Sequence, residues 1–196
     1  MRVPRLSARD RRLLDTLYFL VRLLLLSVPL YLILSNTAVL QPLQEAVTAH
    51  SHALITFLGM ESVKTDLVII TGTCDPFAIF IGPDCTGWKS MLLFFALVFA
   101  TLRVSMKKRL LGLAVGIPVL YAANIVRIAA AVAIQQAYGT QAALFFHDVA
   151  WQAGLTAVVV ALWLAWLFWA RISPALLAAC GSVRSRVKHI IGRAEE

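Results

Sequence analysis

The chain has 196 residues, of which 60% are hydrophobic and only 14% are charged. A soluble domain of this length could not bury so much apolar side chain, so the composition excludes an ordinary soluble globular protein. Several apolar runs reach the roughly 18–20 residues that cross about 30 Å of hydrocarbon. We therefore expect an all-α membrane protein whose surroundings are a lipid bilayer.

In chain order, residues 1–16 form a basic segment, residues 17–170 form the membrane domain and residues 171–196 form a basic tail. The membrane domain is predicted to be a bundle of about four transmembrane helices joined by loops. The predicted spans are Leu17–Leu34, Trp88–Leu102, Leu110–Ile134 and Val149–Ala170.

The long segment 35–87, between the first two spans, has a different pattern. A weaker apolar stretch around Ala53–Met60 lies among charged and histidine side chains, which favours an interfacial helix. Residues 66–82 contain two β-branched or aromatic pieces on either side of the turn-rich Thr71–Pro76, which predicts a small β-hairpin. A bare hairpin would leave backbone groups unsatisfied in lipid, so we expect it at the membrane surface.

The net charge of +8 could indicate nucleic-acid binding, but its distribution argues against that. Fifteen of the 18 Lys and Arg residues lie before or early in the first span, between the second and third spans, or after the fourth. Only Lys64, Lys89 and Arg127 remain for the other side. Positive charge accumulates in cytoplasmic loops, so we expect a multi-pass protein of the cell membrane with both termini cytoplasmic. Segment 35–87 and the short loop 135–148 are then extracytoplasmic.

The first candidate functional group is Cys85, in the sequence Asp84-Cys85-Thr86-Gly87-Trp88 that opens the second span. The positive end of a helix dipole favours a thiolate, the nucleophilic form of cysteine, whereas the carboxylate of Asp84 opposes it. Gly87 is expected to leave room for the backbone of a substrate.

Two further groups lie near the outer ends of the other spans. Arg127 lies within the third span, where a charged side chain is costly and normally faces a partner. Asn124 is one helical turn away on the same face. His147, where the fourth span is predicted to begin, can exchange protons near neutral pH. The predicted topology puts Cys85, Arg127 and His147 at one membrane level, which favours a shared site.

Each residue also has a structural interpretation. Cys85 could be a small apolar side chain, or it could form a disulfide with Cys74 on the same side of the membrane. Arg127 could hold helices together or bind a lipid phosphate, and His147 could be an ordinary interfacial residue. The histidines His50 and His52 are expected to face solvent, and neither a metal site nor an organic cofactor is predicted.

The pattern Cys85-Thr-Gly-Trp88, then Asn124-x-x-Arg127, then His147 resembles the exosortase/archaeosortase family over residues 75–169, in a compact, short form. The resemblance implies a membrane cysteine protease or transpeptidase that works through a thioester. Cys85 would be the nucleophile, with Arg127 and His147 completing the site and Asn124, Gly87 and Thr86 supporting it. The implied substrates are proteins with a C-terminal recognition motif, a hydrophobic helix and a basic cluster.

Two other classes of function fit parts of the pattern. A small transporter subunit would use Arg127 as an anion site inside the bilayer. A non-catalytic assembly factor would hold a sorting partner without needing the thiol. The polar groups gather at one side of the membrane rather than at the midplane of several spans, which favours the enzyme.

Overall fold

A computed structural model describes residues 7–34, 36–72, 76–149 and 153–172. Most of this part of the chain is helical, and a small sheet and one 3-10 turn lie between the second and third α-helices. The elements are α1 (Ala8–Leu34), α2 (Thr37–Phe57), β1 (Ser62–Thr65), β2 (Val68–Thr71), β3 (Phe77–Phe80), the 3-10 turn η1 (Pro83–Thr86), α3 (Trp88–Ala100), α4 (Met106–Tyr138), α5 (Thr140–Val149), α6 (Leu155–Leu167) and the π-helical η3 (Phe168–Ile172).

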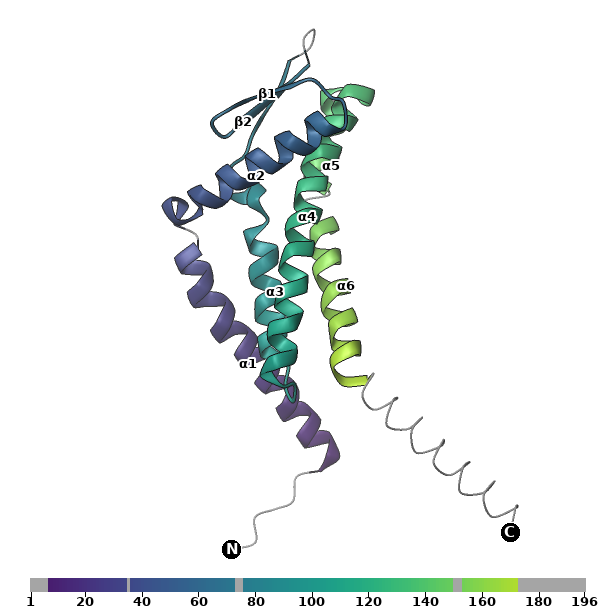
Figure 1. Ribbon diagram of the computed structural model, residues 1–196. Coiled ribbons are helices and arrows are strands. Elements are labelled where there is room, and N and C mark those ends of the chain that lie inside the picture. Colours follow the sequence, from purple (N-terminus) through teal and green to yellow (C-terminus); the bar gives the residue numbers. More distant parts are fainter. Residues whose placement is uncertain (1–6, 35, 73–75, 150–152, 173–196) are drawn as a thin grey trace, which may run out of the picture.

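Four helices, α1, α3, α4 and α6, run along the long axis of the molecule, and α2 crosses one end of them (Figure 1). The sheet and α5 lie at that same end, which we call the sheet end. The start of α1, the α3–α4 loop and η3 lie at the opposite end. Basic side chains are concentrated there, so we call it the basic end.

Two helices in the described part of the chain are long and apolar enough to cross a membrane: α1, over Arg9–Leu32, and the 33-residue α4. The other two predicted spans coincide with shorter apolar helices, α3 with 13 residues and the stretch Leu155–Arg171. Thirteen residues are fewer than the roughly 20 that a perpendicular crossing needs. Length and composition therefore support two of the four predicted spans directly.

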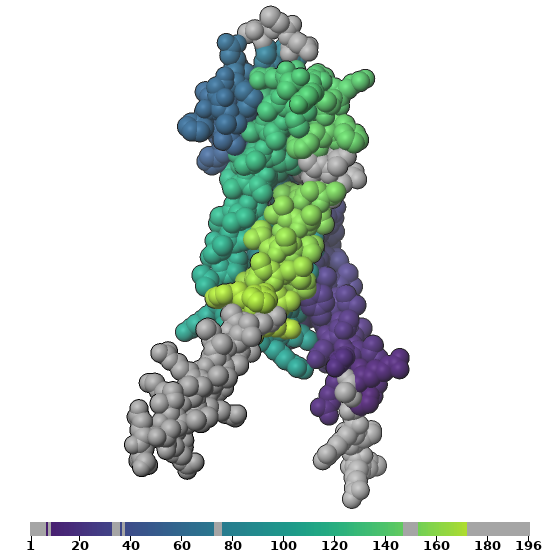
Figure 2. Space-filling view, turned by 90° about the vertical axis from the view of Figure 1, so that its right-hand side faces the viewer, coloured from purple at the N-terminus to yellow at the C-terminus, as the bar shows by residue number. Residues whose placement is uncertain are grey.

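The helices pack tightly where α4 meets α3 and α6. Phe94 of α3 and Trp166 of α6 belong to one buried cluster with Leu120 of α4. A Cβ atom at Gly116 would lie 2.1 Å from Cε1 of Phe94, and one at Gly112 would lie 2.3 Å from Nε1 of Trp166. Both glycines are therefore needed for the close approach of these aromatic rings. Figure 2 shows α6 in the middle of one face of the molecule, with α1 beside it.

At the sheet end, β1, β2 and β3 form an antiparallel sheet in the order β1-β2-β3. The sequence pattern predicts two strands here, and the structure adds β1. The inward side chains Ile69, Ile79 and Ile81 pack against α2 and α4 in two buried clusters. The sheet is thus attached to the helices by one apolar face.

The helix α2 is much longer than the segment predicted around Ala53–Met60. It begins at Thr37, after Asn36, whose side chain accepts a hydrogen bond from the backbone N–H of Ala38. Its buried face includes polar residues, and this lowers the hydropathy by which the sequence analysis recognised helices. The buried polar residues of α2 are Gln44, Thr48 and Ser51.

The prediction of a loop over residues 135–148 is wrong. The helix α4 continues to Tyr138, the chain turns at Gly139 with φ +83°, and α5 follows over Thr140–Val149, packed against α4. Positive φ favours glycine, so this single residue allows two helices to meet where the sequence suggested irregular structure. As a result His147 lies near the end of α5, and α6 begins only at Leu155.

At the basic end, positive side chains hold the ends of neighbouring helices. The guanidinium group of Arg109 donates to the carbonyl oxygens of Phe99 (3.0 Å) and Thr101 (2.8 Å), where α3 ends. The ammonium group of Lys108 donates to the carbonyl oxygen of Ala170 at 2.6 Å. Carbonyls in the last turn of a helix lack partners within it, so these side chains connect α4 to the ends of α3 and η3.

Candidate active site

Cys85 lies in η1, directly after the sheet and before α3. The turn begins after Gly82, and the backbone N–H of Cys85 donates to the Gly82 carbonyl at 3.0 Å. The thiol is free and partly buried, and its sulfur lies 3.9 Å from the carbonyl oxygen of Phe80. Cys74, the disulfide partner considered above, lies outside the described residues.

Arg127 meets Cys85 from α4. Only 7% of its surface is exposed, so its charge is largely removed from water and needs compensating contacts. Its guanidinium group lies close enough to the side chain of Cys85 for the two groups to interact electrostatically. The structure therefore brings together two of the three residues predicted to form the site, from elements 42 positions apart in the chain.

Asn124 fixes the turn that carries the thiol. Its side chain is fully buried, and its Nδ2 donates to the carbonyl oxygen of Cys85 at 2.8 Å. Because Asn124 lies one turn before Arg127, the same face of α4 contacts both the backbone and the side chain of Cys85. The amide thus restricts where the thiol can lie relative to the guanidinium group.

Gly87 has a different role from the one expected. Its φ is +74°, and a Cβ atom there would lie 3.1 Å from Cγ and 3.3 Å from Cβ of Asn124. The space beside this glycine is therefore filled by Asn124 and is not left for a substrate. The glycine allows the chain to turn from η1 into α3 while Asn124 reaches the carbonyl of Cys85.

Thr86 and Asp84 complete the immediate surroundings of the thiol. The hydroxyl of Thr86 is buried; it donates to the Pro83 carbonyl at 2.7 Å and accepts from the backbone N–H of Trp88 at 3.4 Å. The carboxylate of Asp84 forms an exposed ion pair with Lys89 at 2.7 Å. The negative charge next to Cys85 in the sequence therefore has a positive partner close by.

His147 is placed only by its backbone. It belongs to α5, which packs against α4, the helix that carries Arg127. Its side chain lies outside the described residues. Its membership of the site remains a prediction from the sequence.

Two contacts around the site were missed by the sequence analysis. Gln44 of α2 donates through Nε2 to the carbonyl oxygen of Ile81 at 3.0 Å and is 5% exposed. His50 is exposed, as expected, and its Nδ1 also lies 2.8 Å from the hydroxyl of Tyr121. Tyr121 packs in the same cluster as Cys85 and precedes Asn124 by one turn, a spacing that could have indicated its position.

Within the described ranges, no group of three His, Cys, Asp or Glu side chains is arranged to hold a metal ion. The chemistry that this arrangement can support is that of a thiol beside a buried cation. A cysteine beside a buried cation can act as a nucleophile, because the cation can stabilise the oxyanion that forms when sulfur attacks a carbonyl group.

Comparison with curated proteins and with solved structures found no significant match. A family model described as transmembrane exosortase matches residues 5–169, which is most of the chain and includes Cys85, Arg127 and His147. The chain therefore belongs to the transmembrane exosortase family.

Proposed function

We propose that the protein is a membrane cysteine peptidase or transpeptidase that cleaves C-terminal sorting signals of exported proteins at the outer face of the cell membrane. Its substrates carry a short recognition motif, a hydrophobic helix and a basic cluster. The observation that carries the proposal is the placement of the buried guanidinium group of Arg127 near the free thiol of Cys85. Asn124, one helical turn before Arg127, donates to the backbone carbonyl of Cys85 at 2.8 Å, which brings this face of α4 to the turn that carries the thiol.

The proposed topology has four spans, formed by α1, α3, α4 and α6, with both termini in the cytoplasm. The concentration of positive residues at the basic end supports this orientation, because such residues are retained on the cytoplasmic side. The ion pair between Asp15 of α1 and Arg103 of the α3–α4 loop, at 2.9 Å, supports a common level for these two segments. Cys85 and Arg127 lie toward the opposite end and would face the outside.

In the proposed reaction, the thiolate of Cys85 attacks the carbonyl carbon of the scissile peptide and forms a tetrahedral intermediate. When this collapses, the C–N bond breaks, the leaving amine takes a proton, and a thioester to Cys85 remains. An acceptor amine or water then attacks the thioester, and the thiol is regenerated.

The other residues have distinct proposed roles. Arg127 stabilises the negative charge of the thiolate or of the oxyanion, an effect that is strong where water is scarce. His147 supplies the proton to the leaving amine and later activates the acceptor. Asn124 acts through the backbone of Cys85 as a positioning residue.

The two alternatives would use the site differently. A non-catalytic assembly factor would retain its function without Cys85 or His147. A transporter subunit would use Arg127 as an anion site and would not need the thiol. The closeness of Arg127 to the thiol of Cys85 favours the enzyme over an anion site, because a phosphate or carboxylate site gains nothing from a thiol beside the cation.

The test is processing of a tagged candidate substrate in cells that produce the protein. Cys85→Ala and Cys85→Ser should abolish cleavage, and Cys74→Ala should leave it unchanged. Arg127→Gln should lower the rate by about 10²–10³, as expected when one group that stabilises transition-state charge is removed. Unchanged processing by Cys85→Ala would exclude the proposed nucleophile.

The same assay separates the proposed steps. His147→Ala should be inactive, whereas His50→Phe, which removes the histidine that contacts Tyr121, should retain most activity. If the histidine effects are reversed, His50 would take over the proton-transfer role. Hydroxylamine in place of the natural acceptor should yield a hydroxamate of the cleaved substrate, because it intercepts thioesters. Absence of the hydroxamate would contradict the covalent intermediate.

A further inference from the structure

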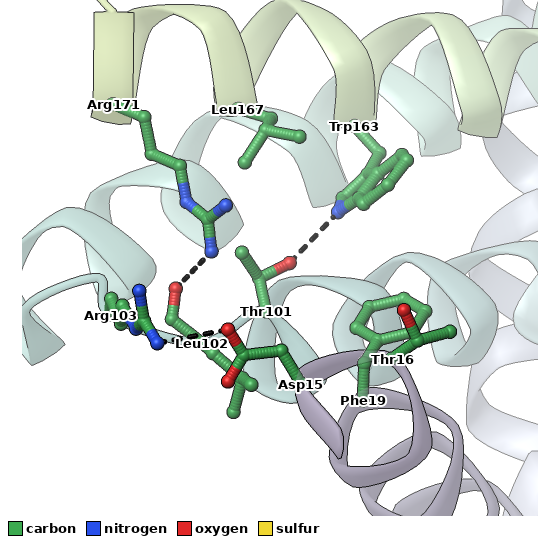
Figure 3. A pocket seen from close by; sticks show the side chains of 9 residues that line it. All are labelled: Asp15, Thr16, Phe19, Thr101, Leu102, Arg103, Trp163, Leu167 and Arg171. Carbon is green, nitrogen blue, oxygen red and sulfur yellow. Dashed lines mark hydrogen bonds and ion pairs between the residues drawn. The ribbon is translucent and has the colours of Figure 1, made fainter. Parts of the chain in front are cut away.

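A cavity of about 280 Å³ opens at the basic end, far from Cys85 along α4. It lies between α1, the α3–α4 loop and the end of α6 with η3 (Figure 3). None of the residues proposed for catalysis lines it. The lining residues are Asp15, Thr16, Phe19, Thr101, Leu102, Arg103, Trp163, Leu167 and Arg171.

Two guanidinium groups reach this cavity from different elements. Arg103 donates to the carboxylate of Asp15 at 2.9 Å, and Arg171 donates to the carbonyl oxygen of Leu102. Each guanidinium group has more N–H donors than these single bonds use. Asp15 is the one acid among the lining residues, so the lining carries a net positive charge.

The backbone at Arg103 is strained. Its φ is +60°, in the left-handed region that residues with a Cβ atom rarely adopt. A glycine or asparagine would take this conformation more readily. An arginine held there places its guanidinium group at the cavity, and strain of this kind tends to occur at binding and functional sites.

The rest of the wall is apolar. Phe19 of α1 and Leu167 of α6 lie on it with Trp163, whose Nε1 is already bonded to the hydroxyl of Thr101 at 3.1 Å. The neighbouring face of α1 carries exposed leucines, among them Leu17 and Leu20. The guanidinium groups of Arg103 and Arg171 therefore lie next to an apolar wall that continues onto the exposed leucines of α1. This arrangement suits a ligand with an anionic head and an apolar tail.

We propose that this cavity binds the phosphate group of an anionic phospholipid from the leaflet that surrounds the basic end. The phosphate accepts hydrogen bonds from Arg103 and Arg171, a pairing in which guanidinium groups act as fork-shaped donors. An acyl chain lies against Phe19 and Leu167. The site does not depend on the thiol chemistry, since it is formed by other residues at the other end of the helices.

The experiment measures lipid retention by native mass spectrometry of the full-length protein in detergent, with phosphatidylglycerol or phosphatidylcholine added. Arg103→Asn keeps a residue that tolerates positive φ, and Arg171→Gln keeps a donor for the Leu102 carbonyl, so both variants should fold. Each should weaken phosphatidylglycerol binding roughly fivefold, as expected for the loss of one basic residue near an anionic headgroup. Lys107→Gln removes an exposed charge outside the cavity and should change binding little.

The expected result is preferential binding of phosphatidylglycerol that depends on Arg103 and Arg171 but not on Lys107. Equal losses in all three variants would indicate diffuse attraction to the basic end and would overturn the proposal. Competition by inorganic phosphate at equal concentration would show a free-phosphate site instead of a lipid site. Equal retention of phosphatidylcholine would show an apolar groove without phosphate recognition, which also contradicts it.

Discussion

Substitution of Gly87 by alanine tests how the turn at Cys85 is held. Two costs are expected. The first is the left-handed conformation at φ +74°, which costs an L-residue about 1–2 kcal/mol. The second is contact with Asn124, since the new Cβ atom would lie 3.1–3.4 Å from three atoms of its side chain. Moving that side chain weakens its bond to the Cys85 carbonyl, a loss of about 1 kcal/mol. The free energy of unfolding should therefore fall by roughly 2–3 kcal/mol.

A matched substitution separates the two costs. Gly59 has φ +78°, and a Cβ atom there meets no atom within 4 Å. Gly59→Ala should therefore show the conformational cost alone, about 1–2 kcal/mol. In an Asn124→Ala background, the Cβ atom of residue 124 still lies 3.3 Å from the new Cβ atom, but the hydrogen bond to the Cys85 carbonyl is already gone. Gly87→Ala should therefore cost about 1 kcal/mol less in that background than in the wild type, which is the coupling between the two sites.

The assay is equilibrium unfolding of the detergent-solubilised protein by titration with sodium dodecyl sulfate, monitored by tryptophan fluorescence. The four proteins needed are the wild type, the two single variants and the double variant, with Gly59→Ala as the control. If Gly87→Ala costs the same with and without Asn124, the side chain does not fill that space. The account of how Cys85 is positioned would then be wrong.

Three further predictions use the same titration. Gly116→Ala should destabilise the protein by roughly 1–3 kcal/mol because the new methyl group overpacks against Phe94. Gly154→Ala is the control: its Cβ atom meets nothing within 4 Å, so it should change stability by less than about 0.5 kcal/mol. Similar values for both variants would contradict the packing. Arg109→Ala should cost about 1–3 kcal/mol because two carbonyls at the end of α3 lose their donor, and a negligible change would show that water replaces it. Thr86→Val should cost about 1–2 kcal/mol through its two lost backbone partners, while Thr86→Ser should retain both bonds; equal stability of the two variants would count against those bonds.

Much of the candidate site could be predicted from the sequence, for a physical reason. A buried arginine in an apolar helix requires a partner, and few polar groups were available near the outer part of that span. The one-turn spacing of Asn124 and Arg127 then put both side chains on the face that meets Cys85.

The roles of Gly87 and α2 could not be predicted in the same way. The conformation of Gly87 depends on Asn124, which is distant in the sequence and brought close only by packing. The helix α2 buries Gln44 through a bond to the carbonyl of Ile81, a partner that exists only once the sheet is attached. A hydropathy pattern counts a buried polar residue as if it were exposed, so it underestimates the length of a helix that buries polar side chains.

The helix α5 was missed because the sequence around Gly139 resembles a loop. A glycine after a long apolar helix indicates where that helix ends, but it does not indicate whether a loop or a second helix comes next. The ten residues of α5 are too few to form a stable helix alone, so packing against α4 is needed. Local sequence could not supply that information.

The length of α4 has a consequence for where a substrate can be cut relative to its own membrane helix. At about 1.5 Å per residue, its 33 residues extend about 50 Å, well beyond the roughly 30 Å of hydrocarbon. Arg127 is about 32 Å from the start of the helix by the same rise, so in the proposed topology it stands close to the outer boundary of the lipid. The bond to be cut must then lie just where the substrate's own helix leaves the membrane. Each residue inserted between that helix and the bond shifts it by up to about 3.3 Å. The position of Arg127 along α4 would thus select substrates by the number of residues between their membrane helix and the bond to be cut, as well as by motif.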